Sequence, residues 1–450
     1  MKIELVKSDI NPVDLSVGSA RTCYSVELKT PNSISEWSKK ESLLKELFLS
    51  GHHTTLQHAT FTFLISDISR LSIWRFFHSH RFYNSDQVSQ RYTSVIDGSF
   101  IYLNDSINRY NIKLINNYKK IVKLLIPIYE KSDNKVEVKN AEKKAMENAR
   151  YILPQSVSAN LYHTINLSTL LRYYLISRDC ESHDAGYEIK AIVDQMVLSV
   201  VSAYPELKNL FFIKNKISKD RLYSKKPLSF YDKNKKCELV DYSNFTNIDY
   251  SFFKGDTSGL SALINSELGT VNLRFNLKLS LSADAQNQRH RTAYGLRPSL
   301  SEIIKENIHE DRSNYYMPKI FNESEEARAI FEESIKLSID FIKKELVDNK
   351  PYLLLNAFQI TIIETNSALD LIHKMEKRLC LNSQEEITEL TWCMLQEIRD
   401  KGDLEGYSKL LAPPCVHRFS DKINPICPEG PRFCGIKEWK NTKYIDLRID

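Results

Sequence analysis

The residues with the most evident chemistry form a run from Gln286 to Arg291, in which Arg289, His290 and Arg291 are consecutive. The run follows an apolar segment, 271–281. The end of a strand or helix ordinarily needs only one cationic or strongly hydrogen-bonding side chain, so three in a row are more than the local structure requires. An arginine guanidinium makes two parallel hydrogen bonds to a phosphate or carboxylate, and His and Gln supply further donors for a polar heterocycle. The run therefore predicts a site for an anionic ligand such as a nucleotide, with a solvated basic patch as the alternative.

A second, less complete copy of this run stands earlier in the chain. It contains His80 and ends at Arg81, and Ser89 follows after seven intervening residues, just as Ser299 follows Arg291. An internal repeat has to be recognised before a fold is predicted. We therefore expect two related halves in tandem.

The bulk composition limits the class of protein. The 450 residues are enough for two or three domains, and 42% hydrophobic with 26% charged residues is typical of a globular protein. The sequence shows no signal-peptide pattern and no apolar run of membrane-spanning length, so we expect a cytoplasmic protein that does not bind a membrane. The net charge of +5 favours local anion sites over a nucleic-acid-binding surface. No Gly-x-Gly occurs, which excludes the common glycine-rich phosphate loops.

Elements of the same kind recur in the same order in both halves. An alternating strand over 59–65 precedes the first basic run, and the 271–281 segment precedes the second. Each run is followed by a long amphipathic helix, the first predicted to end at Pro127 and the second before Pro351. The helical stripes consist of Ile107, Tyr110, Leu114, Tyr118, Ile121 and Leu125 in the first half, and of Ile335, Ile339, Ile342 and Leu346 in the second.

These elements predict the fold class and the domain limits. We expect an α/β (α+β) protein with two similar domains, at 1–212 and 259–412, that pair as a pseudo-dimer. The segment 213–258 is rich in Lys, Asn, Ser and Asp and predicts a polar linker. Residues 413–450 form a small Cys/His-rich tail.

Several motifs together resemble flavin-dependent thymidylate synthases. They are the string Ser50–His58, the strand that follows it, the Arg-His-Arg run with Ser299 after seven residues, and the segment from Arg378 to Glu386. The resemblance covers roughly 49–203 in one half and 271–395 in the other. It does not cover the predicted linker or the tail.

The resemblance implies an activity as well as a fold. Enzymes of this family are oligomers of α/β subunits with sites between subunits. FAD accepts a hydride from NADPH, and methylenetetrahydrofolate supplies the methylene that is reduced to the methyl group of dTMP on dUMP. No protein nucleophile is required. This agrees with the residues, because a nucleophilic Ser89 or Ser299 would need a neighbouring base and arginine cannot accept a proton.

The resemblance also implies roles for individual residues. Arg378 is the catalytic residue expected to stabilise the ionised uracil. The substrate-binding set is Gln286, Arg289 and Arg378 from the second half, with Gln87, Ser89, Arg91 and Arg150 from the first. The flavin-binding set is Thr54, His80, Arg81, Arg289, His290, Arg291 and His373.

Each half lacks what the other retains. Phe76 and Ser79 stand where the first half should have Gln and Arg, and Ser301 replaces the Arg of the second half. The Glu of the family motif is replaced in both halves, by Gln87 and by Arg297. We therefore expect one composite nucleotide site between the halves, with its symmetry mate decayed, and an assembly of two such chains as a dimer of pseudo-dimers. A catalytically silent flavin- and nucleotide-binding protein is the alternative. A nucleic-acid-binding protein would need aromatic and basic residues interleaved on one element, which are not found.

The tail carries a candidate metal site. Cys415, His417, Cys427 and Cys434 lie within twenty residues and are separated by Pro and Gly turns. Such a set can close a tetrahedral Cys3His zinc site of structural type. An iron–sulfur cluster and free thiols are the alternatives.

Overall fold

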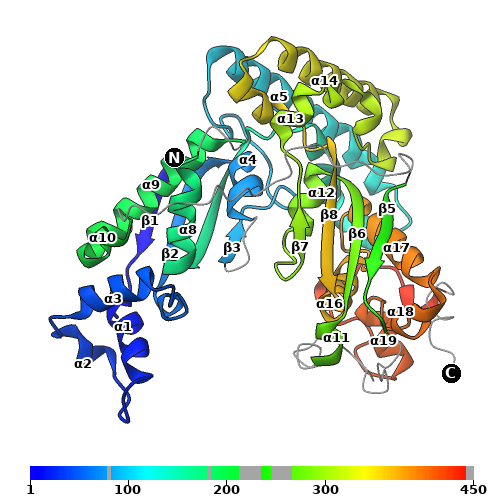
Figure 1. Ribbon diagram of the computed structural model, residues 1–450. Coiled ribbons are helices and arrows are strands. Elements are labelled where there is room, and N and C mark those ends of the chain that lie inside the picture. The colour runs from blue at the N-terminus through cyan, green and yellow to red at the C-terminus, as the bar shows by residue number, and fades with distance from the viewer. Residues whose placement is uncertain (79–82, 180–183, 212–234, 246–265, 442–450) are drawn as a thin grey trace.

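The computed structural model describes residues 1–78, 83–179, 184–211, 235–245 and 266–441. Two four-stranded antiparallel sheets form its framework (Figure 1). The first has the order β1 (Lys2–Val6), β2 (Thr60–Ser69), β4 (Ser158–Asn166), β3 (Tyr83–Gln87). The second has the order β5 (Cys237–Tyr242), β6 (Asn272–Ser280), β8 (Gln359–Ser367), β7 (Tyr294–Leu296). The two sheets thus repeat one strand order along the chain.

The central strands alternate between buried and accessible residues, as expected for strands that bury one face. In β8 the buried positions are Ile360, Ile362, Glu364 and Asn366. Two of these four positions are polar, which is unusual for a core face. The core beneath the second sheet must therefore provide hydrogen-bond or charge partners for one carboxylate and one amide.

Helices cover the sheets and join the two halves. The first half contains α1 (Pro12–Thr22), α2 (Pro31–Ser35), α3 (Lys40–Leu49), α4 (Arg70–Ser72), the π-helix η2 (Ile73–Phe77), α5 (Asp105–Glu130), α6 (Lys135–Lys139), α7 (Ala141–Ala149), α8 (Leu167–Ser177), α9 (Gly186–Ala203) and α10 (Lys208–Phe211). The second contains α11 (Ser266–Thr270), α12 (Leu281–Asn287), α13 (Leu300–Lys305), α14 (Glu325–Lys344), α15 (Lys350–Leu353), α16 (Ala368–Arg378), α17 (Glu385–Arg399), α18 (Glu405–Ser408) and α19 (Pro414–Ser420). Among the described residues, no helix is both long and apolar enough to cross a membrane.

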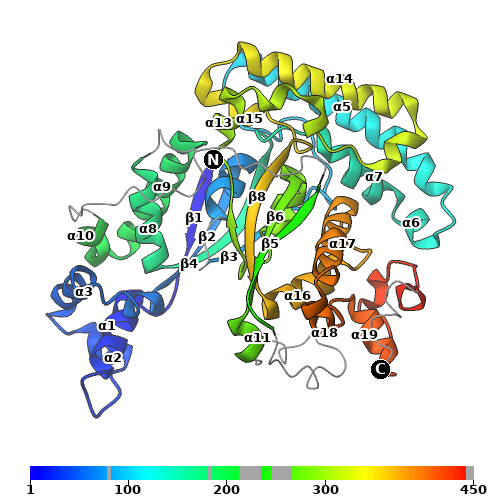
Figure 2. The ribbon, with the colours of Figure 1, turned by 45° about the vertical axis from the view of Figure 1, so that its right-hand side comes forward.

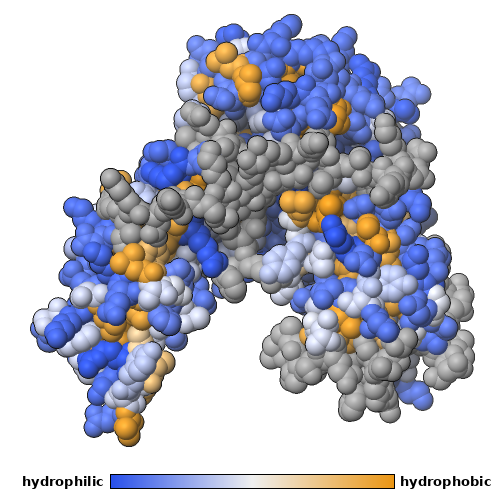
Figure 3. All heavy atoms as spheres, viewed as in Figure 1, coloured by the Kyte–Doolittle hydropathy of each residue, from blue (hydrophilic) through white to orange (hydrophobic). Residues whose placement is uncertain are grey.

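The long helices α5 and α14 lie side by side in both ribbon views (Figures 1 and 2). Asn117 Nδ2 donates to Ser334 Oγ (3.0 Å), and the Tyr110 hydroxyl donates to the carbonyl of Leu353 (2.6 Å). The predicted stripe of α5 is buried throughout. The outer surface around α14 is largely hydrophilic (Figure 3). The two amphipathic helices therefore bury their apolar faces against each other and the core.

Both predicted helix ends need correction. Helix α5 continues through Pro127 to Glu130. Proline removes the hydrogen bond to the carbonyl of Lys123, but both residues are exposed, so water can satisfy that carbonyl. Helix α14 ends at Lys344, and Leu346, predicted on its apolar face, is 73% exposed beyond it.

Reciprocal backbone hydrogen bonds connect the two halves. Gln155 N donates to Leu354 O (2.9 Å), and Asn356 N donates to Leu153 O (2.8 Å). A second pair joins Ser156 N to Tyr352 O (2.9 Å) and Ala357 N to Tyr151 O (2.8 Å). In each pair the donor and acceptor exchange halves, as they do across a two-fold axis.

Two buried carboxylates repeat the same pattern. Glu188 accepts hydrogen bonds from Ser69 and, across the halves, from the Tyr352 hydroxyl (3.0 Å). Glu386 accepts in the same way from Ser280 and from the Tyr151 hydroxyl (2.8 Å). Burial raises the pKa of both carboxyl groups. Ser69 and Ser280, and likewise Glu188 and Glu386, are therefore structural equivalents.

The predicted linker contains a strand, which corrects the prediction for part of 213–258. Strand β5 pairs antiparallel with β6 at the edge of the second sheet, and its Cys237 and Leu239 are buried. Leu239 N also donates to Glu397 of α17 (3.1 Å). The second half therefore begins no later than Cys237, and the remainder of the predicted linker lies largely outside the described residues.

Candidate functional site: a pocket between the two halves

A pocket of ≈ 820 Å³ lies where the two halves and the tail meet. We call it the composite pocket. It is lined by Arg91, Arg289, His290, Arg291, Thr292, Leu369, Asp370, His373, Glu376, Lys377, Arg378, Cys380, Asn382, Ser383, Pro414, Cys415, Cys427, Pro428, Glu429 and Arg432. Six of these side chains are cationic and three are acidic, so the lining favours an anionic ligand. The volume lies within the range of small-molecule and cofactor sites.

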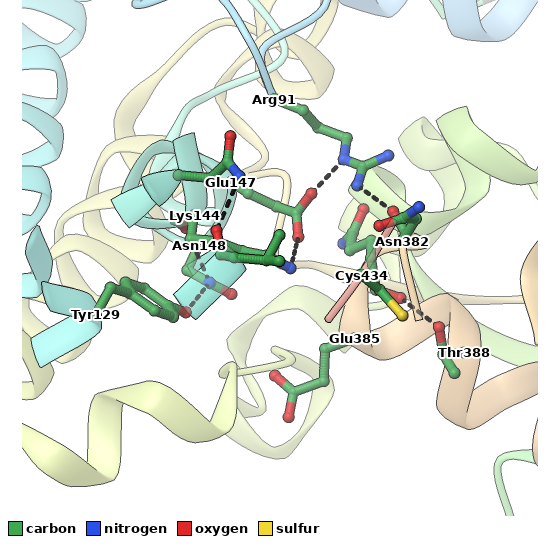
Figure 4. Close-up of polar contacts among 12 residues, drawn as sticks. Arg91, Tyr129, Lys144, Glu147, Asn148, Asn382, Glu385, Thr388 and Cys434 are labelled. Atoms are coloured by element: carbon green, nitrogen blue, oxygen red, sulfur yellow. Dashed lines mark hydrogen bonds and ion pairs between the residues drawn. The ribbon is translucent and has the colours of Figure 1, made fainter. Parts of the chain in front are cut away.

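Arg91 brings the first half into this pocket. Its Nε forms an ion pair with Glu147 of α7, and its Nη2 donates to the backbone carbonyl of Asn382 (2.8 Å), in the loop after α16 (Figure 4). Burial lowers and Glu147 raises the pKa of Arg91, with a net increase. One arginine therefore joins both halves at the edge of the pocket.

The basic run of the second half is fixed on β3 of the first. Arg289 Nη2 lies 3.0 Å from Asp86 Oδ1. Arg291 donates to Asn84 Oδ1 (2.8 Å) and to the carbonyl of Ser85 (2.9 Å). These contacts hold both guanidinium groups across the boundary between the halves, so this side of the pocket exists only when the two are packed together.

Arg378, the last residue of α16, is held at two points. Its Nε donates to His290 Nε2 (2.8 Å) and its Nη2 donates to the carbonyl of Gln286 (3.1 Å). Burial and the charges of Arg91 and Arg289 lower the pKa of Arg378 to about 10. Burial and Arg378 lower the pKa of His290 well below its ordinary value. His290 is therefore the neutral acceptor, and Arg378 keeps its charge at neutral pH.

A buried charged network supports the helix that carries Arg378. Lys374 pairs with Glu364, which also accepts from Asn287 (2.5 Å) and Asn366 (2.9 Å). The counterparts of Glu364 and Lys374 in the first half, each at the same place in its strand or helix, are His163 and Tyr173, which lie against Phe76 and Phe77. The polar network thus belongs to the half whose basic run is complete.

Several predicted residues lie elsewhere. Gln87 and Arg150 line a second cavity, of ≈ 30 Å³, with Arg70 and Gln155. Arg150 also donates to the side chain of Gln384. Ser89 Oγ accepts from Arg91 N (3.2 Å), next to the composite pocket but not in its lining.

The remaining flavin- and nucleotide-binding predictions have mixed outcomes. Arg289, His290, Arg291 and His373 line the composite pocket. Gln286 contributes its carbonyl to Arg378 rather than a side chain to the lining. Thr54 is exposed and does not line the pocket. His80 and Arg81 lie outside the described residues.

The tail forms one wall of the pocket, which the sequence did not indicate. Asn382 Nδ2 donates to the carbonyl of Arg432 (2.5 Å), and Asn134 Nδ2 of the first half donates to that of Cys434 (3.0 Å). Ala412, Val416 and Trp439 form a small core of their own beneath these contacts. The tail is therefore anchored to both halves.

The predicted zinc ligands occupy different positions in the tail. Across the ranges that the structure describes, no group of three His, Cys, Asp or Glu side chains is placed to hold a metal ion. Cys415 and Cys427 face the composite pocket, whereas His417 is completely buried in α19. Burial raises the pKa of Cys415 to about 12. A zinc site at these four residues stays a prediction.

Sequence reasoning missed three residues that organise the pocket: Glu147, Asn382 and Cys380. Cys380 and Asn382 lie in the motif after Arg378, so their position was available from the sequence but their contacts were not. Glu147 carries a usable signal, because it falls on the buried face of α7, where a carboxylate needs a charged partner.

Comparisons with known proteins find relatives of one kind. The flavin-dependent thymidylate synthase of Clostridium tetani is 28% identical over 220 residues, which are 46% of this chain and 85% of that protein. That of Pyrococcus furiosus is 30% identical over 203 residues, 44% of this chain and 78% of the relative.

Solved structures show weaker likeness. Thymidylate synthase X from Helicobacter pylori, with FAD and dUMP, has a TM-score of 0.35 and 20% identity over 47% of this chain and 98% of its own. The UMP/dUMP methylase PolB from Streptomyces cacaoi, with 5-Br dUMP, has a TM-score of 0.34 and 19% identity over 47% and 93%. The sequence matches the family described as thymidylate synthase complementing protein over two segments, residues 4–206 and 260–401. The chain therefore belongs to the thymidylate synthase complementing protein family.

Proposed function

We propose that the protein is a flavin-dependent thymidylate synthase that methylates dUMP to dTMP, using FAD, NADPH and methylenetetrahydrofolate, in the composite pocket. One observation carries the proposal: Arg91 of the first half and Arg289 and Arg378 of the second line the same pocket. These are substrate-binding residues implied by the family motifs, and neither half contains all of them. Relatives named flavin-dependent thymidylate synthase support the reaction.

The halves act together as a covalent pseudo-dimer in this proposal. The common strand order and the reciprocal hydrogen bonds at 151–157 and 352–358 support it. A homodimer of equivalent subunits would have two equivalent sites, whereas fusion allows one of them to drift. Thr54 lies away from the pocket, so we propose that a second copy of the chain supplies this part of the flavin site in a dimer of pseudo-dimers.

The residues of the pocket fit FAD and a nucleotide together. Both ligands carry phosphate, and the pocket offers Arg289, Arg291 and Lys377 as cations. His373, with its side chain 52% exposed, lies 6.0 Å from His290 between ring centroids and has a pKa lowered by burial, so a neutral imidazole faces the pocket. FAD, when bound, supplies the hydride that completes the methyl group.

Arg378 has the geometry of a fixed electrostatic group. Two of its N–H groups are used by His290 and Gln286, which leaves the others for the ionised uracil. Because the guanidinium is already oriented, it stabilises the developing negative charge without reorganisation. Burial, and after it the charges of Arg91 and Arg289, lower the pKa of Arg378, and an anionic ligand offsets the repulsion between these arginines.

The thiols of the pocket are poor nucleophiles. Burial raises the pKa of Cys380 to about 11 and that of Cys415 to about 12. Both are protonated at neutral pH, and the thiolate is the reactive form. Their state agrees with a reaction in which no protein nucleophile attacks the uracil ring.

The visible spectrum of the flavin tests the proposal. We expect the purified protein to show a flavin spectrum that NADPH bleaches under anaerobic conditions, and dUMP to accelerate the bleaching because it completes the anion pocket. dTMP should then form when methylenetetrahydrofolate is added. A flavin that NADPH reduces at the same rate with and without dUMP would instead indicate a catalytically silent flavin- and nucleotide-binding protein.

A further inference from the structure

The mirror position of the composite pocket can be located by counting from equivalent residues. Arg75 is the sixth residue after Ser69, and Gln286 is the sixth after Ser280. Asp184 stands four residues before Glu188, and Asn382 four before Glu386. Ser299 and Ser301 correspond to Ser89 and Arg91. We call Arg75, Asp184, Ser299 and Ser301 the mirror position.

Counted from Ser69, this register places Arg75 at the position of Gln286, whereas counting back from Ser89 places Phe76 there. The chain runs for twenty residues from Ser69 to Ser89 but nineteen from Ser280 to Ser299. A single added residue in a helix produces a π-helical turn. The first half has such a turn, η2 (Ile73–Phe77), where the second has the α-helix α12.

The mirror position is filled by a charged side chain of the protein itself. Asp184 accepts hydrogen bonds from Leu300 N (2.9 Å), Ser301 N (2.9 Å) and Ser301 Oγ (2.6 Å). Its Oδ2 lies 2.6 Å from Arg75 Nη2, and both side chains are 0% exposed. Arg75 also donates to Pro298 O (2.7 Å). A fully buried carboxylate is thus held by the counterparts of substrate-binding residues.

The composite pocket has a different arrangement at the corresponding places. Asn382, the counterpart of Asp184, is uncharged, and its amide turns outward to the carbonyl of Arg432. Gln286, the counterpart of Arg75, is also uncharged, and its side-chain Oε1 is buried without a hydrogen-bond partner. The cation at this side of the composite pocket is Arg91, where the mirror position has Ser301.

We propose that the Arg75–Asp184 ion pair closes the mirror position, with the Asp184 carboxylate in the place that the anionic group of a nucleotide takes in the composite pocket. Each chain then binds one nucleotide and not two. The inference rests on the proposed function, because it takes the composite pocket as a nucleotide site. Closure also explains why the position is buried. A buried Arg75 needs an anion to balance its charge, and the Asp184 carboxylate provides that anion whether or not a ligand is present.

The closed position excludes a second nucleotide on electrostatic grounds. A ligand anion entering there would meet Asp184, a like charge, in surroundings where water cannot screen the repulsion. The donors of Leu300 and Ser301 are also already used. The second site has therefore not only lost binding residues. It is also occupied by the Asp184 carboxylate, which blocks a nucleotide.

The test is the number of dUMP molecules bound per flavin-loaded chain, measured by isothermal titration calorimetry. The wild type should bind one. The double variant Arg75→Gln, Asp184→Asn gives the mirror position the two side-chain types that the composite pocket has, and it removes both buried charges together, so folding should survive. We expect it to bind a second dUMP, at least about tenfold more weakly than the first because the counterpart of Arg91 is still Ser301.

A matched control removes another ion pair of the same half. Arg178→Gln, Asp194→Asn replaces the partly exposed pair between α8 and α9 and should leave the stoichiometry at one. A folded Arg75→Gln, Asp184→Asn variant that still binds a single dUMP would overturn the closure. Two dUMP per wild-type chain would overturn it as well. A wild type that binds no dUMP would contradict the proposed function and this inference together.

Discussion

Arg91→Ala weakens dUMP binding on the order of 100-fold, although Arg91 belongs to the half that lacks most of the basic run. The guanidinium lies at the junction of Glu147, Asn382 and the pocket, and a hydrogen bond to a charged group contributes about 1.5 to 3 kcal/mol. Arg289→Ala, in the other half, weakens binding by about tenfold, because its side chain is 38% exposed and solvent screens its charge. Calorimetric titration with dUMP measures both.

Controls separate this loss from unfolding. Arg91→Ala leaves Glu147 without its arginine, so thermal unfolding of each variant has to be measured beside binding. Arg328→Ala removes a similarly charged residue from an exposed pair on α14 and should leave dUMP affinity unchanged. If either Arg91 or Arg289 can be removed without loss of affinity in a folded protein, the two halves do not share one nucleotide site.

Arg378→Ala lowers kcat by about 10²- to 10³-fold, which is the usual effect of removing one preorganised donor to a developing anion. The KM for dUMP should change less, because the interaction strengthens as the uracil becomes charged. Arg378→Lys should have a kcat between that of the wild type and that of Arg378→Ala, since lysine keeps the charge but cannot bond to both His290 and the carbonyl of Gln286. Steady-state kinetics of dTMP formation provide the measurement.

A second variant checks the specificity of that effect. Arg274→Ala removes an exposed arginine of β6 in the same half and should leave kcat unchanged. An Arg378→Ala enzyme with wild-type kcat and a raised KM would show that Arg378 only binds the substrate. In that case another residue would have to stabilise the ionised uracil.

The repeat explains why so much of the pocket could be predicted from the sequence. Two basic runs with the same distance to a serine imply two similar halves, and complementary losses imply one shared site. The structure places Arg91, Arg289, His290, Arg291, His373 and Arg378 around one pocket. The distance from each basic run to its serine is set within one half, so it can be read directly from the sequence. It stays the same when the two halves pack together.

What the sequence did not predict depends on contacts between distant segments. Asn382 bonds to Arg91 and to the tail, and no local pattern pairs these residues. The sequence of strand β5 resembles a linker because an edge strand of six residues buries only a few side chains, here Cys237 and Leu239, among polar neighbours.

Asp184 shows the limit most clearly. It lies in a loop between α8 and α9, and its sequence neighbours give no sign that the carboxylate is buried against Arg75. Because of the extra residue at η2, counting from Ser69 places Arg75 opposite Gln286, and counting back from Ser89 places Phe76 there. Only the equivalence of Ser69 with Ser280, visible through their bonds to Glu188 and Glu386, restores the register.

A crystal structure of the protein with dUMP tests the central claim most directly. We predict nucleotide density in the composite pocket, with Arg91 on one side, Arg289 and Arg378 on the other, and the Asp184 carboxylate still paired with Arg75 at the mirror position. Density for dUMP that contacts residues of only one half, or that lies outside this pocket, would contradict a composite site between the two halves.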